Sequence, residues 1–287
     1  MQSLPPESDD PPSSTGPRTT AKSPTHDRSP VTYEHTPVSV EGKRAVVIGG
    51  TSGIGRGLAR GFAADGADVV ATSRTDEHVA ETAAELRDIG AETVEVTCDV
   101  TDRESIAAMR DTVVDELGGV DVLVTSQSYI SRTALADSTE ADWQRVFDVQ
   151  LDGTYRATQS FAERMDGGSI VAISSISNQL AIPNLVPYTT AKGGIDSFTR
   201  VAAKELGPEI RVNAIKPGFV RSEQTAGTYD ENTDRYREIE RRTVHGRMAD
   251  PEEIVGAAIY LASDAASYTT GSVLTVDDGF TVDAFGD

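Results

Sequence analysis

The chain has 287 residues, a formal net charge of -20 and an isoelectric point of about 4.5, and of its 26 basic residues five are Lys and 21 are Arg. An acidic surface repels phosphate, which argues against a nucleic-acid partner. Such a surface suits a salt-rich cytoplasm, because its carboxylates hold water and cations and salt screens their repulsion, so we expect a cytoplasmic, halophilic protein, with an ordinary acidic enzyme as the alternative.

The chain has one cysteine, Cys98, which excludes an internal disulfide and fits a reducing compartment. No run of 18 apolar residues occurs, so we expect no contact with a membrane, and the N-terminus lacks the basic start and apolar centre of a secretory signal. Residues 1–40 hold eight of the 13 prolines among Ser, Thr and Asp. We therefore predict a disordered tail at 1–40 and a single domain at 41–287. The two histidines of the tail, His26 and His35, are isolated, so no metal site is expected.

Short apolar runs alternate with helical patterns along the rest of the chain. We expect strands at 44–49, 67–73, 93–98, 120–126, 168–175, 209–215 and 272–279. We expect helices at 53–66, 76–90, from 101 onward, at about 139–165, at 188–207 and at 250–263. Since each strand is continuously apolar, the sequence predicts an α/β fold: one doubly wound domain with a seven-stranded parallel sheet and helices on both faces. Its ligand site then lies at the carboxyl ends of the strands.

The stretch "GGTSGIG" (49–55) follows the first expected strand and opens the first helix. Its glycines, Gly49, Gly53 and Gly55, permit a tight turn and a close approach of backbone to a pyrophosphate, which the helix N-terminus stabilises. A glycine-rich turn without a ligand is the alternative interpretation.

The second expected strand ends in "TSRT", with Ser73 at its tip and Arg74 after it. A carboxylate at this tip would bind the ribose 2′-hydroxyl of NAD, whereas an arginine offers a charged fork to a 2′-phosphate. The sequence therefore favours NADP(H), with NAD(H) possible if Arg74 only stacks on the adenine.

The stretch "YTTAK" places Tyr188 and Lys192 four residues apart, on one face of a helix. A lysine ammonium beside the tyrosine would stabilise its phenolate and lower its pKa from about 10. Tyr188 would then exchange a proton with a carbonyl or alcohol oxygen, to which Ser175 at the end of the fifth strand would hydrogen-bond. A surface tyrosine near a lysine is the alternative.

Taken together, "GGTSGIG", "CDVTD", "ISS" followed by "YTTAK", "RVNAIKPGFV" and "YTTG…VDDG" resemble the short-chain dehydrogenase/reductase family over residues 41–280. The resemblance implies a Rossmann-type sheet, a nicotinamide cofactor and usually a homotetramer. It implies that Tyr188 is the general acid/base, that Lys192 lowers its pKa and binds the nicotinamide ribose, and that Ser175 orients the substrate oxygen. It also places Asp99 at the adenine, Pro217 and Gly218 by the nicotinamide, and Ser222 near the nicotinamide amide. The cofactor-binding residues expected in this way are Gly49, Thr51, Ser52, Gly53, Ile54, Gly55, Ser73, Arg74, Asp99, Val100, Thr125, Tyr188, Lys192, Pro217, Gly218, Val220 and Ser222.

The sequence departs from the family pattern at three places. Residues 125–128 read Thr-Ser-Gln-Ser where the family has Asn-Asn-Ala-Gly, and the larger side chains must either form new hydrogen bonds or crowd the cofactor. Gln150 stands where the family often has a catalytic Asn, and we expect it to preserve a proton relay to the lysine. Asp278 replaces a usual glycine.

We expect an enzyme, because the glycines and the Ser, Tyr and Lys of the site are all present; a non-catalytic cofactor-binding scaffold or sensor is the alternative of another class. The resemblance implies an NAD(P)-dependent oxidoreductase that interconverts a carbonyl and a secondary alcohol. A sugar, polyol or sugar acid is the favoured small-molecule substrate, and a 3-ketoacyl thioester is the other candidate. Residues 219–248 form the expected lid, whose arginines could bind a substrate carboxylate or simply pair along a solvated helix: Arg221, Arg235, Arg237, Arg241, Arg242 and Arg247.

Overall fold

The computed structural model describes residues 34–222, 225, 228–230 and 232–283. The chain divides into two units, Met1–His35 and Thr36–Asp287, and the second contains every element described below. Most of the predicted tail, residues 1–33, lies outside the described residues.

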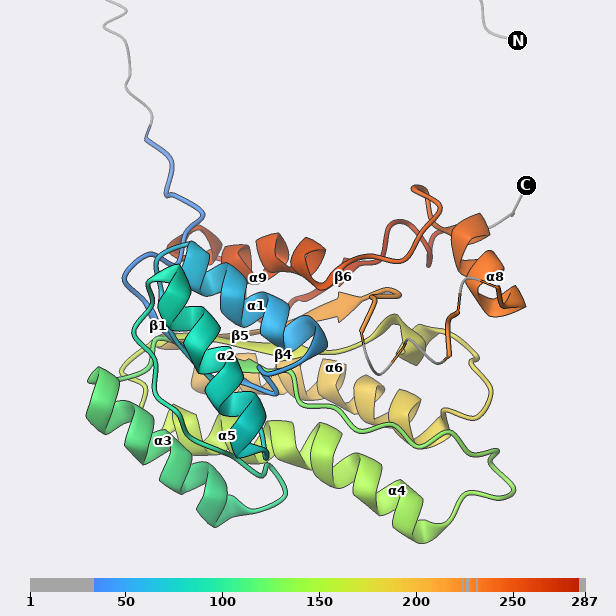
Figure 1. The fold of residues 1–287 in the computed structure, drawn as a ribbon, viewed down its shortest axis with the longest axis horizontal. Coiled ribbons are helices and arrows are strands. Elements are labelled where there is room, and N and C mark those ends of the chain that lie inside the picture. The colour runs from blue at the N-terminus through green and yellow to red at the C-terminus, as the bar shows by residue number, and fades with distance from the viewer. Residues whose placement is uncertain (1–33, 223–224, 226–227, 231, 284–287) are drawn as a thin grey trace, which may run out of the picture. The chain divides into compact units, whose positions relative to one another are not determined.

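A parallel sheet forms the centre of the second unit (Figure 1). Its strands are β1 (Arg44–Ile48), β2 (Asp68–Thr72), β3 (Val122–Thr125), β4 (Gly168–Ile173), β5 (Ile210–Pro217) and β6 (Val273–Val276). They are hydrogen-bonded in the order β2-β1-β3-β4-β5-β6, and every pair is parallel. The strand order reverses beside β1, so the sheet is doubly wound, as predicted.

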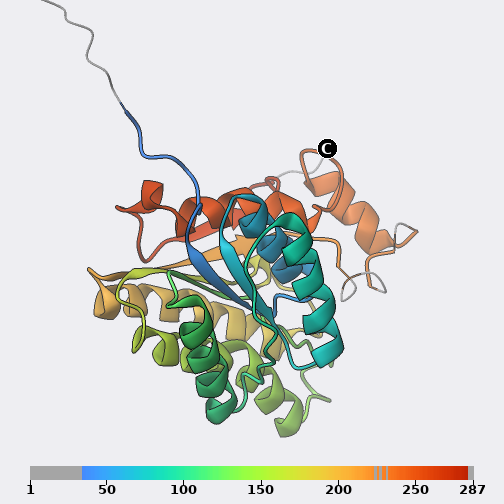
Figure 2. The ribbon, with the colours of Figure 1, turned by 60° about the vertical axis from the view of Figure 1, so that its left-hand side comes forward.

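Helices cover both faces of this sheet. They are α1 (Gly53–Ala64), α2 (Asp76–Ile89), α3 (Arg103–Leu117), α4 (Glu140–Phe147), α5 (Gly153–Ala162), α6 (Val186–Leu206), α8 (Asp234–Arg242) and α9 (Val255–Ala262). Figure 2 shows α9, in red, along one side of the sheet and the green to gold helices α3 to α6 on the other. In the part of the chain that the structure describes, none of these helices is both long and apolar enough to cross a membrane.

Alternate residues of each strand enter two separate cores, because side chains of a strand point to opposite faces. In β1, Ala45 and Val47 pack with α1, α2 and α9, whereas Val46 and Ile48 pack with α3, α5 and α6. All four are buried. Burial on both faces explains why the strands read as continuous apolar runs.

The sheet has six strands, and the prediction of seven is wrong at residues 93–98. This segment runs beside β2, but it is held mainly near its ends, where Val69 donates to the Glu92 carbonyl and Cys98 donates to the Ser73 carbonyl. Between these bonds the Thr72 hydroxyl donates to the Val96 carbonyl at 2.7 Å. The Thr72 side chain thus takes the place of a backbone hydrogen bond. Residues 93–98 therefore have the apolar pattern of a strand but do not form a regular ladder of backbone hydrogen bonds with β2.

The long helix expected at 139–165 begins as predicted, with Thr139 as N-cap, and ends near residue 162. It is interrupted by a π-helical turn at Asp148–Asp152, which separates α4 from α5. Such turns insert an extra residue and often lie at functional sites. Here the turn carries Gln150, one of the predicted site residues.

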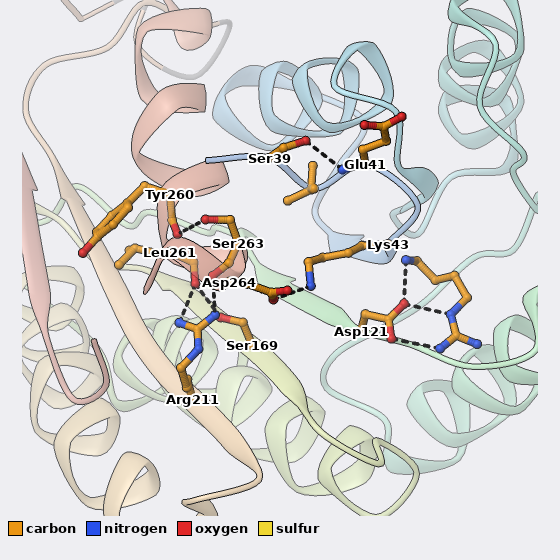
Figure 3. A network of polar contacts seen from close by, with 12 residues as sticks. Ser39, Glu41, Lys43, Asp121, Ser169, Arg211, Tyr260, Leu261, Ser263 and Asp264 are labelled. Atoms are coloured by element: carbon orange, nitrogen blue, oxygen red, sulfur yellow. Dashed lines mark hydrogen bonds and ion pairs between the residues drawn. The ribbon is translucent and has the colours of Figure 1, made fainter. Parts of the chain in front are cut away.

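Polar contacts fasten the amino ends of the strands, opposite to the ends where the ligand site is expected (Figure 3). The Arg211 guanidinium, at the start of β5, donates to the Leu261 and Ser263 carbonyls at the end of α9. Ser169 donates to the same Leu261 carbonyl, and Lys43 pairs with Asp264 at 2.8 Å. These bonds satisfy the last carbonyls of the helix, so this end of the domain serves stability.

Candidate active site

A cleft of about 520 Å³ lies at the carboxyl ends of the strands. All but two of the predicted site residues line it, although they come from widely separated segments. The exceptions are Thr125 and Gln150, which are fully buried beneath its wall. The structure thus gathers the predicted phosphate, adenosine, catalytic and nicotinamide residues around one cavity.

The glycine loop forms one wall, where β1 turns into α1. Gly49 has φ +75°, and a Cβ there would lie 2.6 Å from the Gln127 backbone nitrogen. A Cβ at Gly55 would overlap the Gly49 carbonyl oxygen. The N-cap of α1, Ser52, makes no side-chain capping bond, and the first turn holds no acidic residue. The loop therefore fits a phosphate group, because the first amides of the helix stay available and no carboxylate repels the anion.

The residues predicted to bind the adenosine follow β2 and the 93–98 segment. Ser73, Arg74, Asp99 and Val100 all line the cleft there. Burial alone would raise the pKa of Asp99, but the Thr101 amide and hydroxyl donate to its carboxylate at 2.9 and 2.7 Å and the net shift is downward. The charge of Arg74 also lowers this pKa, and Arg74 lines the same cleft.

The proton-transfer group combines Ser175, which follows β4, with Tyr188 and Lys192 of α6. Ser175 and Tyr188 line the same cleft. The Lys192 ammonium donates to the Ile173 carbonyl at 2.6 Å and lies 5.6 Å from the centre of the Tyr188 ring. The three side chains predicted to act together are therefore close together.

The expected lowering of the Tyr188 pKa is absent from this geometry. Burial raises the pKa of Tyr188 to about 12, although Ser175 acts in the opposite direction. Burial also lowers the pKa of Lys192 to about 7, against the influence of Asp196. The prediction assumed a fully charged lysine, whereas burial in an apolar setting disfavours the charged forms of both side chains.

The departures at 125–128 and at Gln150 contact each other. The Gln150 amide donates to the Ser128 hydroxyl at 3.0 Å and to the Tyr129 carbonyl at 3.1 Å. The Gln127 amide donates to the Thr154 hydroxyl at 3.1 Å. The larger side chains thus form new hydrogen bonds that join the end of β3 to the π-helical turn, and no bond from Gln150 to Lys192 occurs among the described residues.

The residues predicted to lie by the nicotinamide belong to the chain that leaves β5. Pro217, Gly218, Val220 and Ser222 all line the cleft. The Ser222 Cβ lies 3.2 Å from the position that a Cβ of Gly53 would occupy, so this segment approaches the phosphate loop. The lid and the loop therefore face each other across the cleft.

Most of the lid arginines form ion pairs within the protein and none lines the cleft, so they are not placed to bind a substrate. Each of five pairs with a carboxylate at 4.0 Å or less, and none of the six lines the cleft. The pairs are Arg221–Asp250, Arg237–Asp234, Arg241–Glu238, Arg242–Asp283 and Arg247–Glu253. The interpretation of a solvated lid with local ion pairs is the better one for these residues.

Asp278 also has a physical role in the structure. Its φ is +52°, a conformation that favours glycine. Its carboxylate accepts from the His245 amide at 2.8 Å and contacts the His245 ring at 2.6 Å, while its carbonyl accepts from Val244. The aspartate thus fastens the end of the lid to the turn after β6, which offsets the backbone strain.

Among the lining residues that sequence reasoning missed are Tyr129, Arg132, Arg145 and Tyr229. They lie in loops and on the exposed side of α4, where no periodic pattern marks them. Arg132 follows β3 closely in the sequence, and the carboxyl end of a parallel strand is the signal that would have drawn attention to it.

The fold and this cleft define a nicotinamide-dependent oxidoreductase. A family profile described as "Enoyl-(Acyl carrier protein) reductase" matches residues 49–281. D-xylose 1-dehydrogenase of Caulobacter vibrioides is 38% identical over 246 residues, which cover 84% of this chain and 97% of the relative. A crystal structure of a putative NAD(P)-dependent gluconate 5-dehydrogenase from Beutenbergia cavernae, with bound NADP, has a TM-score of 0.80 at 38% identity and covers 86% of this chain and 99% of its own. The 3-oxoacyl-[acyl-carrier-protein] reductase of Thermotoga maritima is 34% identical over 85% of this chain and 99% of its own length.

The chain therefore belongs to the short-chain dehydrogenase/reductase family, as its motifs predicted. It is an NAD(P)-dependent oxidoreductase that acts on CH–OH groups.

Proposed function

We propose that the protein interconverts a secondary alcohol and a carbonyl of a sugar, polyol or sugar acid, with NADP(H) as the favoured cofactor. The observation that carries the proposal is the arrangement of Ser175, Tyr188 and Lys192 at one end of a cleft whose other end is a glycine loop on a helix N-terminus. Two of the relatives are named for xylose and gluconate, which supports a sugar-type substrate.

The residues present fit a dinucleotide. Glycine at positions 49 and 55 lets the loop pack closely, because a Cβ there would clash with the Gln127 backbone or the Gly49 carbonyl. The amides of α1 would hold the pyrophosphate. Arg74 and Asp99 would contact the adenosine, and Pro217, Gly218 and Ser222 the nicotinamide. When bound, the cofactor supplies the acceptor or donor of the hydride.

The side chains of the chain itself manage the proton. In the direction of reduction, the Tyr188 hydroxyl donates its proton to the carbonyl oxygen of the substrate, and in oxidation the phenolate removes the proton of the alcohol. Ser175, which lines the same cleft as Tyr188, holds the same oxygen. Lys192 lies beside the ring and stabilises the phenolate to the extent that it is protonated.

We expect direct titration of the purified protein to give tighter binding of NADPH than of NADH, in about molar KCl that screens the net charge. Oxidation of sugars, polyols and aldonates would then be followed by NADPH absorbance. A folded protein that binds neither cofactor would contradict the proposed function and would favour the scaffold interpretation.

We expect Arg74→Ala to weaken NADPH binding by roughly 10- to 100-fold and NADH binding by less than about threefold, because a hydrogen-bonded charge pair with the 2′-phosphate contributes about 1.5–3 kcal/mol. The measurement is the dissociation constant of each cofactor. Arg87→Ala, which removes an exposed arginine paired with Glu95, is the matched control. Equal losses for both cofactors would show that Arg74 does not discriminate between them.

A ketoacyl-thioester reductase is the second candidate, supported by the Thermotoga relative. The net charge of -20 argues against it, because an acidic carrier protein prefers a basic rim. The same charge supports our proposal of a salt-rich cytoplasm as the working environment.

We also propose a homo-oligomer, a tetramer as is usual in the family. Exposed apolar side chains on α4, α5 and α6 support it: Trp143 is 38% exposed, Tyr155 42% and Val201 57%. Tyr155 packs edge-on against Phe198 at 6.4 Å, so α5 and α6 together present an apolar surface suited to a second copy.

A further inference from the structure

The arginines around the cleft differ from those elsewhere on this acidic molecule. Across the described surface most arginines pair with a carboxylate, such as Arg44 with Asp121 at 2.8 Å. Arg74, Arg132 and Arg145 line the cleft, and none has a carboxylate within ion-pair distance among the described residues. Three arginines without a carboxylate partner among the described residues thus line one cleft of a chain whose net charge is -20.

These charges form two groups. Arg74 follows β2, beside the residues predicted to bind the adenosine, and the charges of both Arg74 and Arg145 lower the pKa of Asp99. Arg132 belongs to the other end. Its neighbour Thr133 donates to the Asn184 carbonyl, in the segment that leads into α6 and Tyr188. Burial raises the pKa of Tyr188 to about 12, and the charge of Arg132 acts in the opposite direction. Recognition of the cofactor would account for Arg74 and Arg145. It does not account for Arg132.

Neighbouring residues fix the position of Arg132. On one side the Ser131 hydroxyl reaches the Asp142 carboxylate of α4 at 3.4 Å. On the other side the Thr133 amide donates to the Asn184 carbonyl at 3.1 Å. The backbone is thus held on both sides of the arginine.

Aromatic rings support the side chain of Arg132. Its guanidinium carbon lies 6.0 Å from the centre of the Tyr229 ring. Tyr229 packs edge-on against Phe219 at 5.3 Å, and Phe219 packs against Phe280 at 4.9 Å. A row of rings from the lid to the turn after β6 therefore backs a guanidinium that faces the cleft.

We propose that Arg132 binds the carboxylate of the substrate, so that the enzyme acts on a hydroxy acid of the aldonate class and on the corresponding oxo acid. The inference rests on the proposed function, whose substrate class it narrows. A guanidinium offers a planar fork that matches a carboxylate and stays charged at all working pH values. Since Lys192 is buried beneath the Tyr188 ring, Arg132 is the exposed cation at this end among the described lining residues, which suits a monoanion better than a phosphate dianion.

The test uses the full chain with NADP⁺ and two substrates, D-gluconate and D-glucitol, which differ only in whether C1 is a carboxylate. Five-carbon aldonates and alditols extend the comparison. We expect kcat/KM to be higher for the acids. We expect Arg132→Ala to lower kcat/KM for the acids by about 10- to 100-fold and to change it by less than about threefold for the alditols. Arg132→Lys keeps the positive charge but lacks the planar fork of the guanidinium. We expect its kcat/KM for the acids to lie between those of the unmodified protein and Arg132→Ala.

Arg200→Ala is the matched control, because Arg200 is exposed on α6 and bonds only to Ser197 among the described residues. It is expected to leave both substrate classes unchanged. Faster turnover of the alditols, or an equal effect of Arg132→Ala on acids and alditols, would overturn the inference while the proposed function stood.

A binding measurement further distinguishes a failure of the inference about Arg132 from a failure of the proposed function. Calorimetric titration of D-gluconate into the Tyr188→Phe protein with NADPH needs no turnover. We expect binding that Arg132→Ala weakens by about 10-fold or more. Absence of gluconate binding would overturn the inference, and absence of turnover with every sugar, polyol and acid would instead remove the proposed function.

Discussion

Replacing Tyr188 by phenylalanine is expected to reduce turnover by roughly a thousandfold while leaving NADPH binding within about twofold. The substitution removes one oxygen, the atom that would exchange a proton with the substrate. The ring and its contact with Lys192 remain. Steady-state kinetics and cofactor titration on the same protein sample provide the measurement.

Tyr155→Phe is the matched control, since Tyr155 is exposed on α5 and does not line the cleft. We expect its kinetics to equal those of the unmodified protein. Undiminished turnover in Tyr188→Phe would remove the tyrosine from the mechanism. A parallel loss of NADPH binding would mean that the hydroxyl organises the cleft and does not transfer a proton.

The raised pKa of Tyr188 has a consequence for the two directions of the reaction. With a pKa of about 12, the phenol is protonated at neutral pH, which is the form needed to donate to a carbonyl. Oxidation of an alcohol needs the phenolate, which becomes more abundant as pH rises towards that value. We therefore expect the rate of alcohol oxidation to rise with pH above neutrality.

Local sequence patterns were sufficient for the fold and for most of the site. Continuous apolar runs located β1 and β3, because burial on both faces leaves no room for polar residues. The glycine loop and "YTTAK" could be identified because each depends on a short spacing along one turn or one helix face. Once the strands were parallel, their carboxyl ends had to meet, which brought Ser175 and Gly49 into one cleft.

What the sequence could not predict depends on contacts between distant segments. The 93–98 segment has a strand pattern, but its pairing with β2 is partly replaced by the Thr72 hydroxyl. The bond from Gln150 to Ser128 joins two departures that looked independent in the sequence. Arg132 and the lid arginines are the same residue type in the sequence. They differ in whether a carboxylate lies within ion-pair distance, and this depends on the folded structure.

The second large effect is expected at the glycine loop. A methyl group at Gly55 would overlap the Gly49 carbonyl oxygen, which is backbone and has no free rotation to escape. Overpacking of this kind costs about 1–3 kcal/mol, and the loop must open to relieve it. We therefore expect Gly55→Ala to weaken binding of NADPH and NADH alike, by about 100-fold, since the displaced amides no longer converge on the pyrophosphate. Cofactor titration and thermal unfolding measure the two effects.

Gly256→Ala provides the contrast, because Gly256 lies in α9 with no atom within 4 Å of the position of its Cβ. Alanine is more favourable than glycine in a helix by about 0.5–1 kcal/mol, so this variant is expected to be as stable as the parent or more so, with unchanged cofactor affinity. If Gly55→Ala bound both cofactors as tightly as Gly256→Ala does, the loop would be free to relax, and the close packing of Gly55 on Gly49 would not be what shapes the phosphate site. A selective loss of NADPH alone would place the damage at Arg74 and the adenosine end, and not at the pyrophosphate.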